Sequence, residues 1–198
     1  MHAILCGQYR LYANHLVQTL VGPFLQIRGK TNRSSCRYAP FREDGVASIT
    51  TDIVDAYVFR HRQGRAQFLL LRRRAELPLG NTWHGIHGRV AEDETSLEAA
   101  RRAIRIQTGL GNLAAFSADY INQFFDHATD TIVLAPVFAF QLMDDFPISL
   151  DDEFDDYAWC DRDEATGRLI FAGQRWAVRH IEDIVANPVA DSDFYRLP

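Results

Sequence analysis

Residues 88–110, GRVAEDETSLEAARRAIRIQTGL, constrain the fold of this chain more than any other segment. A strand-like run over residues 83–90 leads to Gly88, an acidic turn follows, and a helical pattern from Thr95 to Thr108 ends at Gly109. Thr95 and Glu98 have the spacing of a capping box, in which the two side chains satisfy exposed backbone N–H groups at the helix start. Glycine is favoured just beyond a helix because it adopts the left-handed conformation readily. The segment therefore predicts a strand, a loop and a helix with both ends defined.

The two sides of this helix differ in chemistry. With about 100° of rotation per residue, one face carries Ala99, Ala103, Ile106 and Gln107, whereas Glu98, Arg101, Arg102 and Arg105 point away. Magnesium takes hard oxygen ligands, mainly carboxylates, and the first face offers only the neutral oxygen of Gln107. Glu98 lies nearly opposite and is predicted to pair with Arg102, four residues on. The pattern favours a capped amphipathic core helix over a working metal site.

The spacing of the segment resembles the signature of the Nudix family, hydrolases of nucleoside-diphosphate-linked compounds. The matching positions are Gly88, Glu94, Arg102, Ile104, Gly109 and Leu110. In the family pattern, glutamates stand where this chain has Ala103, Ile106 and Gln107. Upstream, WHGIHG at residues 83–88 is similar to the family's Trp-x-x-Pro-Gly-Gly, with Ile86 for proline and His87 for the first glycine. The resemblance spans roughly residues 52–186 and implies a Nudix-type α/β/α sandwich.

The rest of the chain predicts the same class, an α+β fold with a mixed β-sheet between helices. Residues 55–61 and 66–74 form a predicted hairpin around Gln63 and Gly64, and residues 119–125, 131–142 and 157–159 are further strands. An amphipathic helix is expected over residues 174–186, with Trp176, Ile181, Ile184 and Val185 toward the core. Residues 1–45, with an apolar stretch at 16–27, are predicted to be an N-terminal arm or linker, and residues 46–198 the Nudix-like domain.

Composition and charge argue against several classes of protein. A chain of 198 residues accommodates one domain with a sizeable core, and a net charge of -5 argues against a nucleic-acid partner. Cys6, Cys36 and Cys160 are odd in number and widely spaced, so neither a disulfide framework nor a zinc site is expected. No apolar run approaches the roughly 20 residues of a membrane span. A cytoplasmic protein without a membrane partner is the expectation.

The resemblance assigns roles to individual residues. Glu94 and Arg102 match two retained positions of the family signature, which forms the catalytic box of active relatives. In the family, these two positions usually brace the loop against the helix. The expected ligand-binding residues are Arg72, Trp83, His87, Gly88, Gln107 and Glu153. Glu94 and Glu153 would hold metal only if the protein is an enzyme. Alternative interpretations stay open: Trp83 could pack in the core, and the arginines and the acidic loop at 151–156 could simply be solvated. A metal site formed by His84, His87 and His127 has only weak support from their spacing.

Three functions follow from these observations. The leading hypothesis is a Nudix-fold protein whose metal-dependent pyrophosphohydrolase activity is lost or reduced and which binds a small nucleotide-like ligand or acts as an interaction domain. The second is an active hydrolase of a nucleoside-diphosphate-linked substrate, with Mg²⁺ or Mn²⁺ held by Glu94 and the 151–156 loop; otherwise no cofactor is expected. The third is a scaffold that self-associates through the N-terminal arm, and a homodimer is left open.

Overall fold

The computed structural model describes residues 46–187 and 192–198. The predicted arm at residues 1–45, and with it the self-association that the arm was proposed to drive, lies outside the described residues. The predicted domain from residue 46 onward contains the elements that follow.

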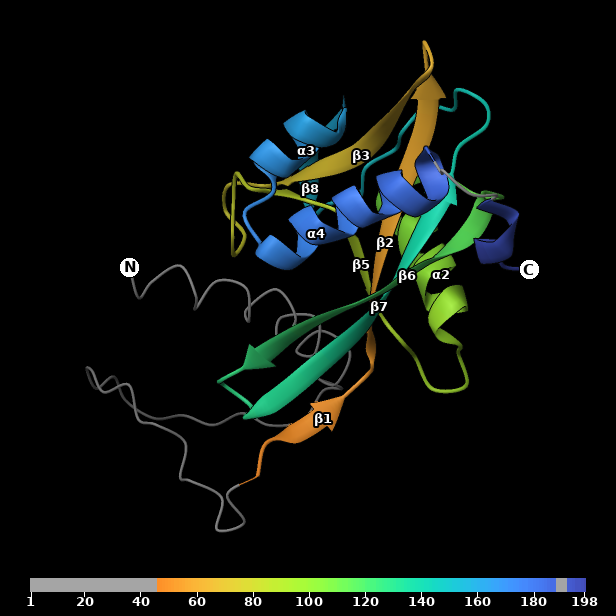
Figure 1. Ribbon diagram of the computed structural model, residues 1–198. Coiled ribbons are helices and arrows are strands. Elements are labelled where there is room, and N and C mark those ends of the chain that lie inside the picture. Colours follow the sequence, from red (N-terminus) through yellow and green to blue (C-terminus); the bar gives the residue numbers. More distant parts are fainter. Residues whose placement is uncertain (1–45, 188–191) are drawn as a thin grey trace.

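A mixed sheet forms the centre of the molecule (Figure 1). Its strands are β1 (Ser48–Thr50), β2 (Ile53–Arg62), β3 (Arg65–Arg73), β4 (Trp83–His84), β5 (Ile86–Arg89), β6 (Ala114–Asp126), β7 (Thr131–Gln141) and β8 (Phe154–Cys160). β7 runs parallel to β1 and β2 and antiparallel to β6. β2 pairs antiparallel with β3 and β5, and β3 pairs antiparallel with β4 and β8.

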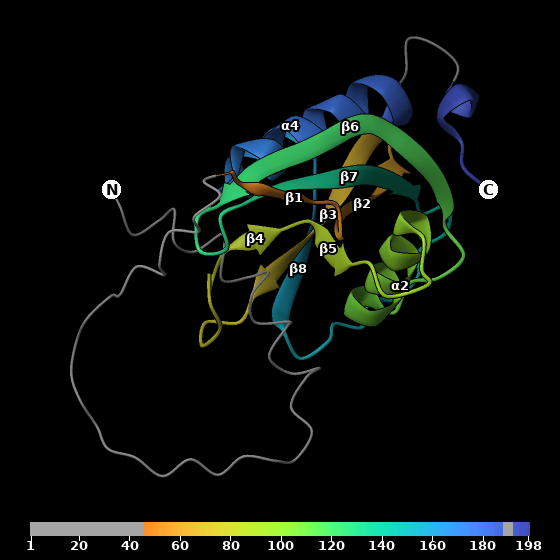
Figure 2. The ribbon, with the colours of Figure 1, turned by 90° about the horizontal axis from the view of Figure 1, so that it is seen from below.

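Helices cover both faces of the sheet. They are α2 (Ser96–Thr108), α3 (Arg162–Arg168) and α4 (Ala172–Ile181), followed by a π-helical turn, η1 (Glu182–Ala186), and a short 3-10 helix, η2 (Ser192–Tyr195). Seen from below, α2 lies on one side of the strands and α4 on the other (Figure 2). The predicted α+β sandwich with a mixed sheet between helices is confirmed.

The alternation of side chains along β2 explains why both faces need a cover. Val54 and Val58 belong to the apolar core under α2, whereas Tyr57 and Phe59 belong to the core under α3 and α4. All four are almost fully buried. Because successive strand residues point to opposite faces, a strand that is apolar on both sides specifies a sheet between two helical layers.

Two local predictions match the structure. Gln63 and Gly64, with φ of 52° and 75°, make the two-residue turn between β2 and β3, and positive φ at both positions is the geometry that suits a tight hairpin. Thr95 caps α2, both hydrogen bonds of the capping box are present, and Gly109 ends the helix with φ of 72°. The ends of α2 are therefore set by the residues that the sequence indicated.

Other expectations were wrong in detail. Trp176 is 59% exposed and lies against Arg179 rather than in the core. Ile181 and Val185 are buried as predicted, and Gln174, Ala177 and Val178 complete the buried face of α4. Glu98 does not pair with Arg102, because its carboxylate accepts hydrogen bonds from the N–H and hydroxyl of Thr95. The strand predicted over residues 83–90 is split into β4 and β5, and neither β1 nor α3 was predicted.

Candidate functional site

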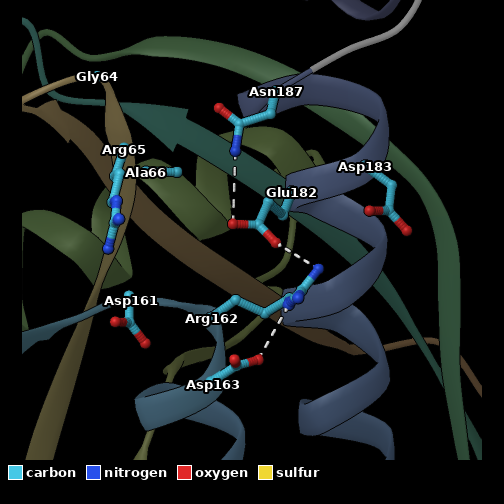
Figure 3. A pocket seen from close by; sticks show the side chains of 9 residues that line it. All are labelled: Gly64, Arg65, Ala66, Asp161, Arg162, Asp163, Glu182, Asp183 and Asn187. Carbon is cyan, nitrogen blue, oxygen red and sulfur yellow. Dashed lines mark hydrogen bonds and ion pairs between the residues drawn. The ribbon is translucent and has the colours of Figure 1, made fainter.

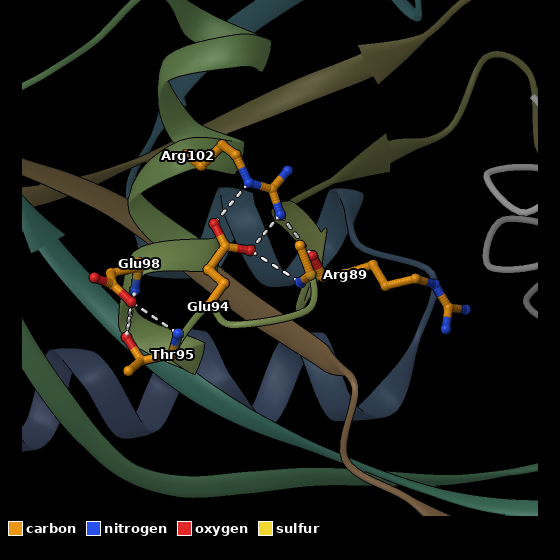
Figure 4. A network of polar contacts seen from close by, with 6 residues as sticks. Arg89, Glu94, Thr95, Glu98 and Arg102 are labelled. Atoms are coloured by element: carbon orange, nitrogen blue, oxygen red, sulfur yellow. Dashed lines mark hydrogen bonds and ion pairs between the residues drawn. The ribbon is translucent and has the colours of Figure 1, made fainter. Parts of the chain in front are cut away.

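An ion pair ties the loop after β5 to α2 (Figure 4). Arg102 Nε donates to Glu94 Oε1 and Arg102 Nη2 to Glu94 Oε2, both at 2.7 Å. The same Nη2 donates to the carbonyl of Arg89 at 2.7 Å, and the N–H of Ala91 donates to Glu94 Oε2 at 3.0 Å. Arg102, and to a lesser extent the Ala91 N–H, lower the pKa of Glu94 to about 2. Both oxygens of Glu94 are thus engaged in bracing the loop, as the resemblance implied.

Gly88 allows α2 to lie close to β5. A Cβ added at Gly88 would come within 3.0 Å of Ala103 Cβ and 3.3 Å of the Ala99 carbonyl oxygen and of Val54 Cγ2. Helix and strand could not approach as closely with a side chain here. The glycine therefore belongs to the packing that positions the helix beside the loop.

A cavity of about 180 Å³ opens between α2, β5 and the loop before β8, and we call it the α2 cleft. Four of its lining residues are apolar: Ile53, Ala103, Ile106 and Phe154. The others are Gly88, Gln107, His87, Arg73, Arg89, Arg102, Asp151 and Glu153. The cleft thus combines an apolar wall with arginines and carboxylates.

The arginines of the cleft are joined to carboxylates. Arg73, almost buried, donates from Nη1 to Glu153 Oε2 at 2.8 Å. Arg89 pairs with Asp52, and Arg102 with Glu94 as described. These pairs neutralise the positive charge of the wall.

Asp151 and Gln107 add hydrogen-bond acceptors. Asp151 Oδ1 accepts the N–H of Glu153 at 3.0 Å, and burial, followed by the nearby acidic side chains, raises the pKa of Asp151. Gln107 donates from Nε2 to the carbonyl of His87 at 2.7 Å, while its Oε1 is buried and has no hydrogen-bond partner among the described residues. Neighbouring Ile106 is 54% exposed. The cleft side of α2 therefore presents an amide, apolar groups and the paired guanidinium of Arg102.

The structure brings together most of the predicted site residues. His87, Gly88, Gln107 and Glu153 line the α2 cleft together with Arg102, and Glu94 reaches it through its bond to Arg102.

Arg72 and Trp83 lie elsewhere. The Arg72 side chain pairs with Asp155 at 2.8 Å, and its guanidinium lies 6.0 Å from the centre of the Trp83 ring. Arg73, the next residue on β3, lines the cleft instead. Strand alternation explains the difference, because Arg73 shares the α2 side of β3 with Leu71 and Arg72 points to the other face.

A buried polar network on the α4 side of the sheet was missed by sequence reasoning. Asp55, fully buried in β2, accepts a hydrogen bond from Asn122 Nδ2 at 3.0 Å and lies 2.7 Å from His87 Nδ1. His87 Nε2 lies 2.9 Å from Gln174 Nε2 of α4. Burial lowers the pKa of nearby His84 to about 3. A lone aspartate inside the apolar run of β2 was the one sequence signal for this network.

A second, larger cavity of about 410 Å³ lies on another part of the surface (Figure 3). It lies between the β2–β3 turn, the start of α3 and η1, and Arg162 crosses it to pair with Glu182 at 3.0 Å and Asp163 at 3.2 Å. None of the predicted site residues lines it.

Two negative findings apply to the described part of the chain. Residues 46–187 and 192–198 contain no group of three or more His, Cys, Asp or Glu side chains arranged to hold a metal ion. None of their helices is long and apolar enough to cross a membrane.

The chain is an α+β sandwich with a mixed sheet between helices. A loop is clamped to the helix that follows it, and a cleft opens beside both. Residues 50–183 match the NUDIX domain model. The chain therefore belongs to the NUDIX family.

Three known proteins illustrate the relationship. An octanoyltransferase of Myxococcus xanthus is 31% identical over 128 residues, which are 64% of this chain and 35% of that protein, so the chain spans about a third of its length. The Ap4A hydrolase of C. elegans, solved as a binary complex, superposes with a TM-score of 0.60 at 18% identity, covering 70% of this chain and 100% of the other. The NUDIX domain of Shewanella oneidensis NrtR, complexed with ADP ribose, gives 0.52 at 14% identity over 73% and 92% of the two chains. These structural likenesses show the fold.

Proposed function

We propose that this NUDIX domain binds a small nucleotide-type ligand in the α2 cleft, with metal-dependent pyrophosphohydrolase activity lost or much reduced. The observation that carries the proposal is the cleft side of α2, where Ala103 and Ile106 offer no oxygen and Gln107 donates its amide to the His87 carbonyl. Metal-assisted phosphoryl chemistry needs carboxylates that hold the ion and ready a water. The braced loop and the cleft are present all the same, and they support a binding role.

A NUDIX domain solved with ADP ribose gives a precedent for a bound nucleotide-type ligand. At 14% identity this precedent concerns the fold alone. The ligand class for this chain is therefore proposed from the cleft and from family membership together.

The test is an assay of phosphate and pyrophosphate release from a panel of nucleoside-diphosphate-linked compounds with Mg²⁺ or Mn²⁺. We expect release at background, equal for the natural chain and Glu94→Gln. Metal-dependent release that Glu94→Gln abolishes would contradict the proposal. The double variant Ile106→Glu/Gln107→Glu changes two positions that are not buried and adds two carboxylates to the cleft. It should therefore bind Mg²⁺ more tightly than the natural chain in calorimetry.

A second candidate, an active hydrolase, draws support from the loop before β8. Asp151 and Glu153 line the same cleft as Arg102, so carboxylates from this loop and Glu94 would be the metal-holding residues. This reading requires Glu94 and Glu153 to exchange their arginine partners for the ion. It predicts Mg²⁺ or Mn²⁺ binding that is lost in Asp151→Asn/Glu153→Gln, and calorimetry without such binding removes it.

A further inference from the structure

The charges of the α2 cleft disfavour an anionic group inside it. The arginine fork suits phosphate oxygens, but Arg73, Arg89 and Arg102 each already pair with a carboxylate, which offsets their positive charge. Glu153 is the partner of Arg73, whereas Asp151 brings one further negative charge that forms no ion pair within the described chain. A pyrophosphate entering the cleft would compete with Glu153, Asp52 and Glu94 for these guanidinium groups and would lie beside the Asp151 carboxylate.

The size and the apolar wall of the cleft fit a neutral group. Ile53, Ala103, Ile106 and Phe154 supply the apolar surface, and Ile106 is more than half exposed. The cavity of about 180 Å³ is close to the roughly 150 Å³ of an apolar protein cavity that binds benzene. One ring-sized group would fill it and cover Ile106.

The polar atoms left over in the cleft are acceptors. Asp151 uses one carboxylate oxygen for the Glu153 N–H, and the other has no hydrogen-bond partner among the described residues. Gln107 Oε1 is a buried acceptor without a partner within the described chain. Because Gln107 Oε1 has almost no accessible surface, the acceptor that a ligand can reach is the second Asp151 oxygen. A ligand that donates a hydrogen bond to this oxygen is favoured over one that only accepts.

We infer that the α2 cleft takes an uncharged, ring-sized group that carries an N–H donor, such as a nucleobase, and leaves any phosphates outside. This inference rests on the proposed function, because it names the part of the nucleotide-type ligand that the cleft selects. The resemblance to the family signature implies that a pyrophosphate would lie beside α2. The inference places the ring there instead.

The experiment is calorimetric titration of the full chain with three probes: adenine, adenosine diphosphate and inorganic pyrophosphate, each with and without Mg²⁺. We expect adenine and adenosine diphosphate to bind with Kd values within about threefold of each other, and pyrophosphate not to bind. Ile106→Ala should weaken adenine binding about tenfold, because it removes apolar contact. Arg105→Ala, next to it and outside the cleft lining, should leave the Kd unchanged.

The outcomes separate the two proposals. Adenosine diphosphate or pyrophosphate binding at least tenfold tighter than adenine without metal would overturn the inference and leave the binding function standing. Failure of adenine to bind, or an equal loss in Ile106→Ala and Arg105→Ala, would also overturn it. Metal-dependent hydrolysis of adenosine diphosphate would overturn the proposed function, while the adenine titration still decides the inference.

Discussion

The Glu94–Arg102 pair should contribute measurably to stability because it joins the loop after β5 to α2. Its perturbation is Glu94→Gln, which keeps the shape of the side chain and removes its charge. The fall of the Glu94 pKa from 4.5 to about 2 corresponds to at most about 3.4 kcal/mol. Arg102 is 35% exposed, so solvent screens the pair, and part of the fall comes from the Ala91 N–H. We therefore expect a pair energy of about 1–2 kcal/mol.

The assay is urea unfolding of the natural chain, Glu94→Gln, Arg102→Met and the double variant, which isolates the pair energy. Because the folded-state pKa of Glu94 is lowered, its contribution is fully present above pH 4.5 and disappears as the pH falls toward 2. The penalty of Glu94→Gln should shrink between pH 7 and pH 3. Arg105→Met, at an exposed arginine of the same helix, should change stability by less than about 0.5 kcal/mol. A coupling below about 0.3 kcal/mol, or a penalty independent of pH, refutes the reasoning.

Three further predictions concern the packing of Gly88, the buried Asp55 network and the charge of Asp151. Gly88→Ala should lower stability by about 1–3 kcal/mol, since its Cβ meets Ala103 at 3.0 Å, while Gly111→Ala, with open space around it, should be nearly neutral; thermal melts that show equal effects would contradict this. Asp55→Ala should cost about 2–5 kcal/mol in urea unfolding, because His87 loses its buried partner, and a loss below 1 kcal/mol would count against the network. Asp151→Asn should raise Tm at pH 7 and have little effect below pH 3.8, because a raised folded-state pKa makes the charged carboxyl unfavourable as the pH rises; no gain at pH 7 would be the contrary result.

Features that depend on neighbouring residues were predictable from the sequence. Thr95, Glu98 and Gly109 act within one or two turns of the helix, so their spacing alone gave the limits of α2. Gln63 and Gly64 likewise gave the hairpin. The apolar cleft side of α2 followed from the helical period.

Features that depend on distant contacts were not predictable. Trp176 has the spacing of a core residue, but the small Ala177 and the amide of Gln174 occupy the buried face of α4. Glu98 could have bonded either to Thr95 at the helix start or to Arg102. It bonds to Thr95, and Arg102 bonds to Glu94, eight residues earlier. Alternation along β3 separates Arg72 from Arg73, but the sequence does not show which of the two faces is closed by α2 and the loop before β8 to form the cleft.

His87 connects the two helical layers within a single residue. Its carbonyl accepts the amide of Gln107 on α2, while its ring lies against Asp55 and Gln174 beneath α4. A ligand that displaces Gln107 would pull on the backbone of β5 and thereby on the ring that reaches α4. Motions of the two helices should therefore be correlated although a sheet separates them, and occupancy of the cleft should be detectable as a change in amide exchange at the start of α4.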